Sequence, residues 1–309
     1  MPKDLVFFGN ERLASGCTTK LPILNALINS EHPIKLIVIS EKGTKSRNKR
    51  ELEVEEFAAK HNIELFIPKN TQELKNKLTK VNAEVGVLAA YGKIISQEII
   101  NTFPDGIINL HPSLLPKYRG PTPIESAILS GDEKTGVSIM ALSSGMDSGP
   151  IYSQVELGLN GKESKQELVD SLGMLGSIEI IKVLTSGQEP KPQNGTPTIC
   201  SLIQKSDSNI DLSKPAKVLE REVRAYLGWP GSKLKLELAN GKELEIIVTN
   251  SRVEKPIGNQ QEQVLTADRH FMVKTSKDYL EILSLKLPGK KEITAAEFLN
   301  GYSKVIKGL

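Results

Sequence analysis

The feature that most constrains the fold is a series of short, almost wholly apolar runs that alternate with amphipathic stretches in the first half of the chain. The runs are rich in β-branched or aromatic residues and are bounded by turn residues, as buried strands are. Strands of this kind separated by helices indicate a parallel sheet covered on both faces. The expected strands span residues 5–9, 34–40, 63–68, 84–92 and 106–111, with helices at 21–28, 54–62 and 71–81.

Two more strands and a long helix follow in sequence. "TGVSIMAL" (135–142) and "IYSQVEL" (151–157) are the strands, and the helix runs from about Lys165 to Thr185. We therefore predict a first domain over residues 1–188. Its fold class is α/β, with an open, doubly wound and mostly parallel sheet of the Rossmann-like kind.

The amino-acid composition of the chain changes after this domain. Residues 189–208 are rich in Pro, Gly, Ser and Gln and lack periodicity, which predicts a linker. Residues 214–227 then read as a helix and are followed by short alternating strands. Strands at about ten-residue spacing favour a small OB-like β-barrel, so we predict a second domain over 209–309.

Composition excludes several classes of protein. Hydrophobic residues make up 39% and charged residues 25% of the 309, the profile of a soluble globular protein. Cys17 and Cys200 are far apart and belong to no ligand cluster, and the histidines lack metal-site spacing, so we expect no disulfide scaffold and no metal. No apolar run is long enough to span a bilayer, and "MPKDLVFFGN" leaves no room for a leader peptide. We expect a cytoplasmic monomer without membrane contact.

Two polar residues mark the end of the strand 106–111. In "NLHPSLLPKYRGPTP" (109–123), Asn109 and His111 stand two apart and Pro112 ends the strand. Strand alternation places both side chains on one face, at the carboxyl edge where doubly wound sheets bind ligands. An isolated Asn-x-His pair is more often only a buried polar strand end.

A third polar residue lies farther along the chain. Asp147 belongs to the glycine-flanked loop "SSGMDSGP" after strand 135–142, and we expect that strand to end at the same rim. Alone, Asp147 would be a loop-capping residue. Together, an amide that polarises a carbonyl, an imidazole that moves a proton and a carboxylate that orients the imidazole suit acyl-type chemistry. No Ser or Cys nucleophile is evident, which favours direct transfer to an external nucleophile.

The loop after the first expected strand lies where anion-binding loops lie, but it lacks their sequence motifs. "FFGNERLASG" (7–16) follows a strand and opens a helix, but it lacks both GxGxxG and GxxxxGK[ST]. A tight turn is as good an interpretation of it as a ligand site.

The block "NLHPSLLPKYRGPTPIESAILSGDEKTGVSIMALSSGMDSGPIY" resembles the signature region of the formyltransferases that use 10-formyltetrahydrofolate. The resemblance extends over nearly the whole chain and is strongest to the members that formylate methionine on initiator tRNA. "LAAYGKIIS", "VRAYLGWPGSKLKL" and "LKLPGKKEITAAEFLNG" also match family segments. Two places depart from the family pattern: Tyr118 stands where Trp is frequent, and "FGNERLA" replaces the usual "FxGTPxFA".

The resemblance implies a reaction and roles for particular residues. The α-amino group of methionine on initiator tRNA attacks the formyl carbon of 10-formyltetrahydrofolate through a tetrahedral intermediate, giving N-formylmethionyl-tRNA for translation initiation. Asn109 would donate a hydrogen bond to the oxyanion. His111 would assist it or accept the amine proton, and Asp147 would set the charge state of His111. The implied folate contacts are Ser113, Leu114, Leu115, Pro116, Tyr91, Gly92, Lys93, Ile94, Ile95, Ala141 and Leu142.

A basic run and the charge of the second domain point to RNA. The run comprises Lys42, Lys45, Arg47, Lys49 and Arg50. A solvated loop is the ordinary interpretation of such a run. At the carboxyl rim, however, it would contact the phosphates of an RNA acceptor end, the role that the resemblance implies. Residues 209–309 carry a net charge of +4, which suits a tRNA platform.

Two alternatives stay open at this point. A formyltransferase that acts on an amino-sugar nucleotide would share the catalytic block, although the basic run favours RNA. A non-catalytic RNA-binding relative would not require Asn109, His111 and Asp147 at one rim.

Overall fold

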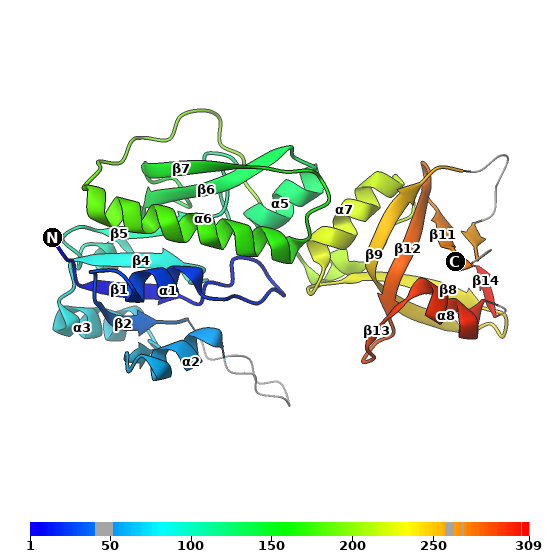
Figure 1. Cartoon of the computed structure of the whole chain (residues 1–309), viewed down its shortest axis with the longest axis horizontal. Coiled ribbons are helices and arrows are strands. Elements are labelled where there is room, and N and C mark those ends of the chain that lie inside the picture. Colours follow the sequence, from blue (N-terminus) through cyan, green and yellow to red (C-terminus); the bar gives the residue numbers. More distant parts are fainter. Residues whose placement is uncertain (41–51, 257–262, 267–268, 304, 309) are drawn as a thin grey trace. The chain divides into compact units, whose positions relative to one another are not determined.

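The computed structural model describes residues 1–40, 52–256, 263–266, 269–303 and 305–308. Internal contacts divide the chain into two compact units (Figure 1). The first comprises Met1–Ile124, Glu133–Asn160 and Gln166–Ser201, and the second comprises Glu125–Asp132, Gly161–Lys165 and Leu202–Leu309. Residues 189–201 of the expected linker therefore group with the first unit.

The first unit is built around a seven-stranded sheet with the order β3-β2-β1-β4-β5-β6-β7. Neighbours from β3 to β5 are parallel, whereas β6 is antiparallel to β5 and β7 is antiparallel to β6. The predicted fold class, a mostly parallel α/β sheet, is confirmed. The strands are β1 (Leu5–Gly9), β2 (Ile34–Val38), β3 (Leu65–Phe66), β4 (Val85–Ala89), β5 (Ile107–His111), β6 (Lys134–Ala141) and β7 (Ile151–Gly158).

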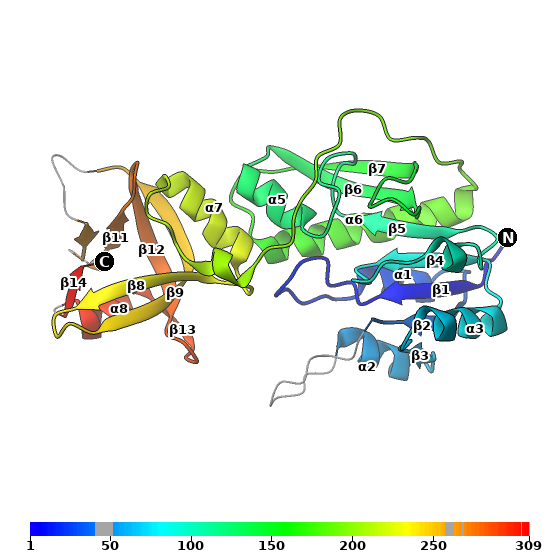
Figure 2. The ribbon, with the colours of Figure 1, turned by 180° about the vertical axis from the view of Figure 1, so that it is seen from behind.

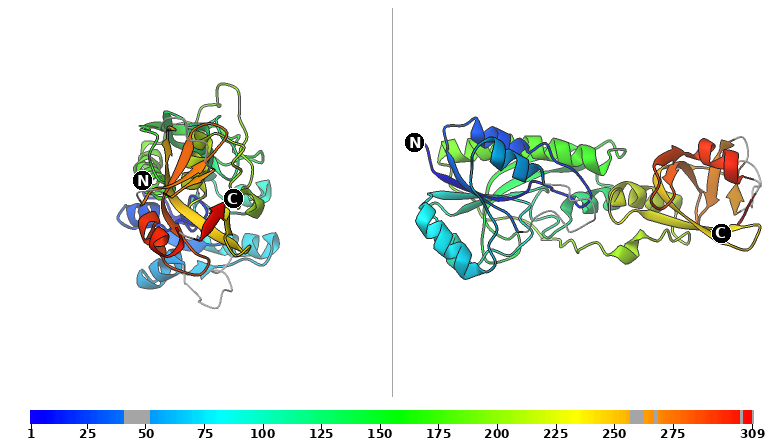
Figure 3. Two further views of the ribbon diagram at one scale, coloured as in Figure 1. Left: turned by 90° about the vertical axis from the view of Figure 1, so that its right-hand side faces the viewer. Right: turned by 90° about the horizontal axis from the view of Figure 1, so that it is seen from below.

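Helices cover both faces of this sheet. The right-hand view of Figure 3 shows α1 (Pro22–Ile28) and α6 (Lys165–Ser186) on one face and α3 (Thr71–Val81) on the other. On the α3 face, Val6 and Phe8 of β1 pack with Leu74 and Leu78 in one fully apolar cluster. Alternation turns the neighbouring β1 side chains to the opposite face, which is why β1 is apolar throughout. The unit also contains α2 (Glu53–Lys60) and α4 (Gln97–Ile100), and α5 spans Pro123–Ser130.

The direction of β6 corrects one prediction. Its carboxyl end, Ala141, pairs with Ile108 near the start of β5, while His111 pairs with Ser138. The expectation that this strand ends at the same rim as Asn109 and His111 was wrong. A buried strand reads as an apolar run in either direction, so the pattern does not encode the direction in which the strand runs.

The second unit contains an antiparallel sheet that curls around its own core (Figure 1). The strand order is β10-β11-β12-β9-β8-β14, and β13 pairs with β12. Phe271 stacks on Phe298 with ring centroids 5.8 Å apart inside this core. An antiparallel, OB-like second domain is thus confirmed. The elements are α7 (Ala216–Tyr226), β8 (Ser232–Leu238), β9 (Glu243–Glu254), β10 (Val264–Leu265), β11 (Phe271–Lys274), β12 (Tyr279–Lys286), β13 (Glu292–Thr294), α8 (Ala295–Tyr302) and β14 (Ile306–Gly308), after a short 3-10 turn at Lys205–Ser208.

None of the helices in the described part of the chain has the length and apolar character needed to cross a bilayer.

Candidate active site

Asn109 and His111 occupy the carboxyl end of β5, as the alternation of the strand predicts. Both side chains are buried, with exposed fractions of 5% and 4%. Asn109 lies between Leu88 of β4 and Met140 of β6 in the sheet register. Pairing on both sides fixes the backbone of β5, so the amide and the imidazole have well-defined positions.

A cavity of about 760 Å³ opens at this end of the sheet. Asn109, His111 and Asp147 all line it, so the three predicted catalytic residues meet at one cavity. The other lining residues are Asn10, Arg12, Leu13, Ala14, Ser15, Gly16, Cys17, Thr18, Ser40, Leu52, Leu88, Ala90, Tyr91, Gly92, Leu110, Pro112, Gly120, Pro121 and Pro123.

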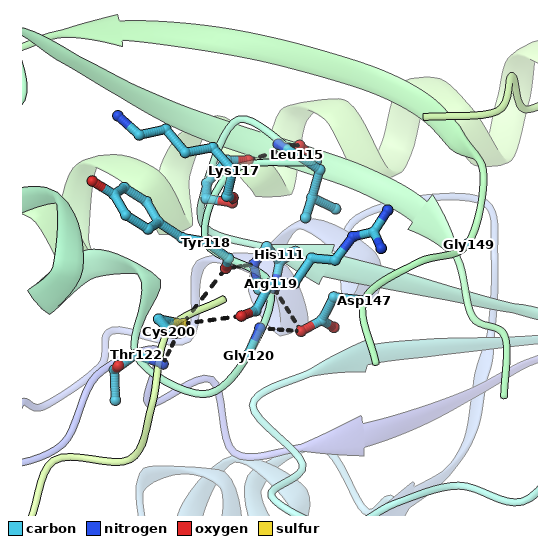
Figure 4. A network of polar contacts seen from close by, with 12 residues as sticks. His111, Leu115, Lys117, Tyr118, Arg119, Gly120, Thr122, Asp147, Gly149 and Cys200 are labelled. Atoms are coloured by element: carbon cyan, nitrogen blue, oxygen red, sulfur yellow. Dashed lines mark hydrogen bonds and ion pairs between the residues drawn. The ribbon is translucent and has the colours of Figure 1, made fainter. Parts of the chain in front are cut away.

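The hydrogen bonds of His111 define its tautomer. Nε2 lies 2.8 Å from the backbone carbonyl oxygen of Tyr118 (Figure 4). A carbonyl only accepts, so Nε2 carries the proton and donates it, and Nδ1 of the neutral ring keeps its lone pair. Nδ1 lies 3.7 Å from Oδ2 of Asp147.

The pKa of His111 lies below its usual value. Burial is the largest cause, because it disfavours the imidazolium, while the Asp147 carboxylate and the Tyr118 carbonyl act in the opposite direction. His111 is therefore neutral near pH 7. A neutral imidazole with a free lone pair is able to accept a proton.

Asp147 reaches the site through the loop of residues 142–150, which joins β6 to β7. This loop returns along β5 after β6 has ended at the far end of that strand. The backbone N–H of Gly120 donates to Oδ2 of Asp147 at 2.8 Å. The backbone of Asp147 has a φ of 44°, in the left-handed region that is unfavourable for a residue with a Cβ. The bond from Gly120, outside the loop, supports this conformation.

The segment after α6 forms one wall of the site. Figure 2 shows this segment passing over the β7 edge of the sheet. The N–H of Arg119 donates to the Thr198 carbonyl at 2.9 Å, and the N–H of Cys200 donates to the Arg119 carbonyl at 2.8 Å. A Cβ on Gly120 would lie 2.4 Å from the Cys200 carbonyl oxygen. Only glycine therefore fits where these two segments of the chain meet.

The predicted folate residues occupy several environments. Tyr91 and Gly92 line the cavity. Lys93 donates from Nζ to the Ser40 carbonyl at 2.8 Å, whereas Ile95 is buried in the core next to Tyr91. The Ile94 side chain is 97% exposed beside them. Contact of Lys93, Ile94 and Ile95 with folate stays a prediction.

The other predicted folate residues are not among the cavity residues. Ser113 donates from its hydroxyl to the Lys117 carbonyl, and the N–H of Leu115 donates to Ser138 Oγ. These bonds brace the turn that follows β5. Leu114, Pro116, Ala141 and Leu142 also lie outside the cavity lining. Their contact with folate stays a prediction.

The first loop contributes more of the cavity than sequence reasoning anticipated. Asn10, Arg12 and residues 13–18 all line it. Oε2 of Glu53 accepts from Nε and Nη2 of Arg12 at 2.9 and 2.7 Å, which holds the guanidinium at the cavity wall. The signal was the position of "FFGNERLASG" between a strand and a helix, a context that does not depend on a motif.

The basic run of Lys42, Lys45, Arg47, Lys49 and Arg50 lies outside the described residues. Within the described ranges, no group of three or more His, Cys, Asp or Glu side chains is arranged to hold a metal ion.

Comparison with known proteins agrees with this architecture. Residues 13–184 match the family model described as Formyl transferase, and residues 202–303 match the Formyl transferase, C-terminal domain. The chain is 32% identical to a methionyl-tRNA formyltransferase of Thermodesulfovibrio yellowstonii, over 100% of this chain and 99% of the relative. It is 34% identical to one of Chloroflexus aurantiacus, over 90% of this chain and 92% of the relative.

Solved structures share the fold at low identity. An N-formyltransferase of Helicobacter canadensis, in complex with folinic acid and dTDP-3-aminofucose, superposes with a TM-score of 0.65 at 16% identity, over 91% of this chain and 99% of that one. HypX of Aquifex aeolicus in complex with tetrahydrofolic acid superposes with a TM-score of 0.63 at 16% identity, over 100% of this chain and 49% of that one. The two family models together span most of the chain, and the relatives align with it over nearly its full length. The protein therefore belongs to the formyl transferase family.

Proposed function

We propose that this protein transfers the formyl group of 10-formyltetrahydrofolate to the α-amino group of methionine on initiator tRNA. The observation that carries the proposal is that Asn109, His111 and Asp147 line one cavity. They do so in a chain similar over its whole length to methionyl-tRNA formyltransferases. The product is N-formylmethionyl-tRNA, the initiator of translation, and the protein works as a cytoplasmic monomer.

The chemistry follows from the positions of three polar groups. The amine nitrogen of methionine forms a bond to the formyl carbon, and the bond from that carbon to the folate nitrogen breaks. Negative charge develops on the formyl oxygen and is stabilised by the amide N–H of Asn109. The amine loses one proton and the departing folate nitrogen gains one, so no net proton is released.

His111 moves this proton. Its Nδ1 lone pair accepts the proton of the attacking amine, because Nε2 is already committed to the Tyr118 carbonyl. The imidazolium that forms is stabilised by the carboxylate of Asp147, 3.7 Å away. A base of this kind contributes about 100- to 10,000-fold to a rate.

The folate enters beside β4. Tyr91 and Gly92 line the cavity, and Lys93, Ile94 and Ile95 follow them in the chain. Main-chain groups of this segment and of Ala141 and Leu142 suit the polar edge of a pterin ring. Residues 113–116 complete the folate side of the site.

The tRNA is held by positive charge. Lys42, Lys45, Arg47, Lys49 and Arg50 contact phosphates of the acceptor end, and the second domain, with a net charge of +4, supports the body of the RNA. Binding of this kind weakens as salt is added, because bound counterions are released when the phosphates are neutralised.

The test is transfer of a labelled formyl group from 10-formyltetrahydrofolate to methionyl-initiator tRNA. We expect Asn109→Ala to lower kcat by about 100- to 1,000-fold, the effect of losing one oxyanion donor. His111→Ala should lower it by about 100- to 10,000-fold, the range for loss of a general base. Asp147→Ala should also lower it, because the imidazolium loses its counter-charge.

Asn101→Ala is the matched control, since Asn101 is an exposed asparagine outside the cavity. It should keep the wild-type rate. Wild-type activity in the three site variants would contradict the assigned roles. Formyl transfer to an amino-sugar nucleotide and not to tRNA would contradict the assigned substrate.

A further inference from the structure

The Gln193 side chain links two walls of the site. Its Nε2 donates to the backbone carbonyls of Asp147 and Gly149, each at 2.8 Å. Its Oε1 accepts from Nε and Nη2 of Arg119 at 3.1 and 2.7 Å. Both N–H groups and both acceptor positions of this amide are therefore used. They bond to two segments distant in sequence, one at Arg119 and the other at residues 147–149.

The backbone of Arg119, the residue that bonds to Gln193, is itself held by hydrogen bonds. Its N–H and carbonyl bond to Thr198 and Cys200, in the same segment that carries Gln193. The next residue, Gly120, donates its N–H to the Asp147 carboxylate. Asp147 is thus held at its carboxylate by Gly120 and at its backbone carbonyl by Gln193.

The loop around Asp147 needs such support. Residues 142–150 contain no regular secondary structure, and Asp147 adopts the left-handed conformation with φ 44°. Strained backbone of this kind persists only where surrounding contacts over-determine it. The backbone hydrogen bonds within the loop include a long one, from the Ser148 N–H to the Gly145 carbonyl at 3.4 Å. The two bonds from Gln193, at 2.8 Å, are considerably shorter.

We propose that Gln193 is a positioning residue for formyl transfer, which holds the Asp147 carboxylate beside His111. The proposal rests on the proposed function for its kinetic consequence. Gln193 does not line the cavity, so it acts through Asp147 and not on the substrate. A misplacement of about 1 Å at a reacting group costs on the order of 100-fold in rate.

The test compares two substitutions. Gln193→Met keeps the length of the side chain and removes all its hydrogen bonds. Gln193→Glu keeps an acceptor for Arg119 but replaces the donor to Asp147 and Gly149 by a charged oxygen. We expect both to lower kcat by about 10- to 100-fold. The KM for 10-formyltetrahydrofolate should change little, because the folate contacts stay in place.

Gln188→Met is the matched control. Gln188 lies in the same segment and donates from Nε2 to the Tyr152 carbonyl at 2.7 Å, away from Asp147. It should keep the wild-type kcat and the wild-type dependence on pH. Thermal unfolding of all the variants checks that the fold is intact.

A second measurement does not depend on activity. The chain has four histidines, so NMR can follow the titration of His111 in the full-length protein. Asp147 is the charged group that raises the pKa of His111 against the effect of burial. When the Gln193 bonds are lost and the carboxylate withdraws, the pKa of His111 should fall further.

Each outcome decides the proposal. A lower kcat together with a lower pKa of His111 supports it. An unchanged pKa of His111 in both variants overturns it, whatever happens to kcat, and so does an equal loss of kcat in Gln188→Met. Should Gln193→Met fail to fold, Gln193→Glu carries the same test. If wild-type protein transfers no formyl group, the proposed function fails, while the titration still reports on the position of Asp147.

Discussion

Glu11 is a buried carboxyl group that the mechanism does not use. Its side chain is 2% exposed, and its two oxygens accept the N–H groups of Ile23 and Leu24 at 2.9 and 2.7 Å. Burial nevertheless raises the pKa of Glu11 to about 7, because the two hydrogen bonds offset only part of the lost hydration. Glu11 belongs to the "FGNERLA" departure, so the replacement introduces a titratable group under the first helix.

The raised pKa predicts a dependence of stability on pH. The folded chain binds the Glu11 proton more tightly than the unfolded chain does, so the stabilisation is fully present below the ordinary pKa of 4.5 and is lost as the pH rises through about 7. One pKa unit corresponds to about 1.4 kcal/mol, so the loss is of the order of 3 kcal/mol. Urea unfolding of wild type and Glu11→Gln from pH 4 to 8 measures it.

The difference in free energy of unfolding between wild type and Glu11→Gln should fall across this interval. Glu56→Gln, at an exposed glutamate, is the matched control. A constant difference for Glu11→Gln would show that the carboxyl group ionises as freely in the folded chain as in the unfolded one.

At the scale of elements, local signals decide where helices begin. The Asn70 side chain accepts from the Glu73 N–H at the start of α3, and a capping box joins Thr294 to Glu297 at the start of α8. Helix α3 lies where its periodicity predicts it. Helix α8 was not predicted as a helix, although Thr-x-x-Glu before an apolar run is a helix-start signal. In the sequence, α8 follows β13 (Glu292–Thr294) without a break, so no turn residues separate its apolar residues from those of the strand.

The capping box of α8 gives a prediction at this scale. Thr294→Ala removes the acceptor of the Glu297 N–H and should destabilise the second unit by about 1 kcal/mol. Thr294→Ser keeps the acceptor and should be close to wild type. Trp229 is the only tryptophan and belongs to the second unit, so its fluorescence during urea unfolding reports on this unit. Equal stability of the Ala and Ser variants would show that the cap contributes nothing.

At the scale of the whole molecule, segments far apart in the chain bury charge together. Lys165 and Glu125 are each 1% exposed, and Lys165 Nζ lies 3.8 Å from Glu125 Oε1. Nζ also donates to the Trp229 carbonyl at 3.3 Å. The second unit includes residues 125–132 and 161–165, which lie in sequence between the stretches that form the first unit.

Breaking this pair should be costly. Lys165→Ala removes one charge of a buried pair and should lower the free energy of unfolding by about 3 to 5 kcal/mol. Lys235→Ala is the control in the same unit, because the pair of Lys235 with Glu243 is exposed and contributes about 0 to 1 kcal/mol. The double variant Lys165→Met with Glu125→Leu should recover much of the loss, since no charge is left buried. Urea unfolding followed by Trp229 fluorescence compares the three.

The order of strands and helices in the first unit could be predicted because each buried strand is apolar along its whole length. Strands at the edge of the sheet were predicted less well. The expected strand 63–68 is reduced to β3 (Leu65–Phe66), which pairs only with β2. The helix α4 has only four residues, too few for the hydrophobic pattern to reveal it, and α5 is buried on most of its sides, so it lacks a clear polar face.

The sequence by itself determined that Asn109 and His111 share a face, because side chains alternate along a strand and Pro112 ends it. It also placed Asp147 in a loop. Only the tertiary structure decided how Asp147 meets His111. The antiparallel β6 ends at the far end of β5, and Gly120 and Gln193, 27 and 46 residues away in sequence, hold the returning loop. These contacts depend on strand direction and on a segment that packs across the sheet edge, and neither leaves a periodic pattern in the sequence.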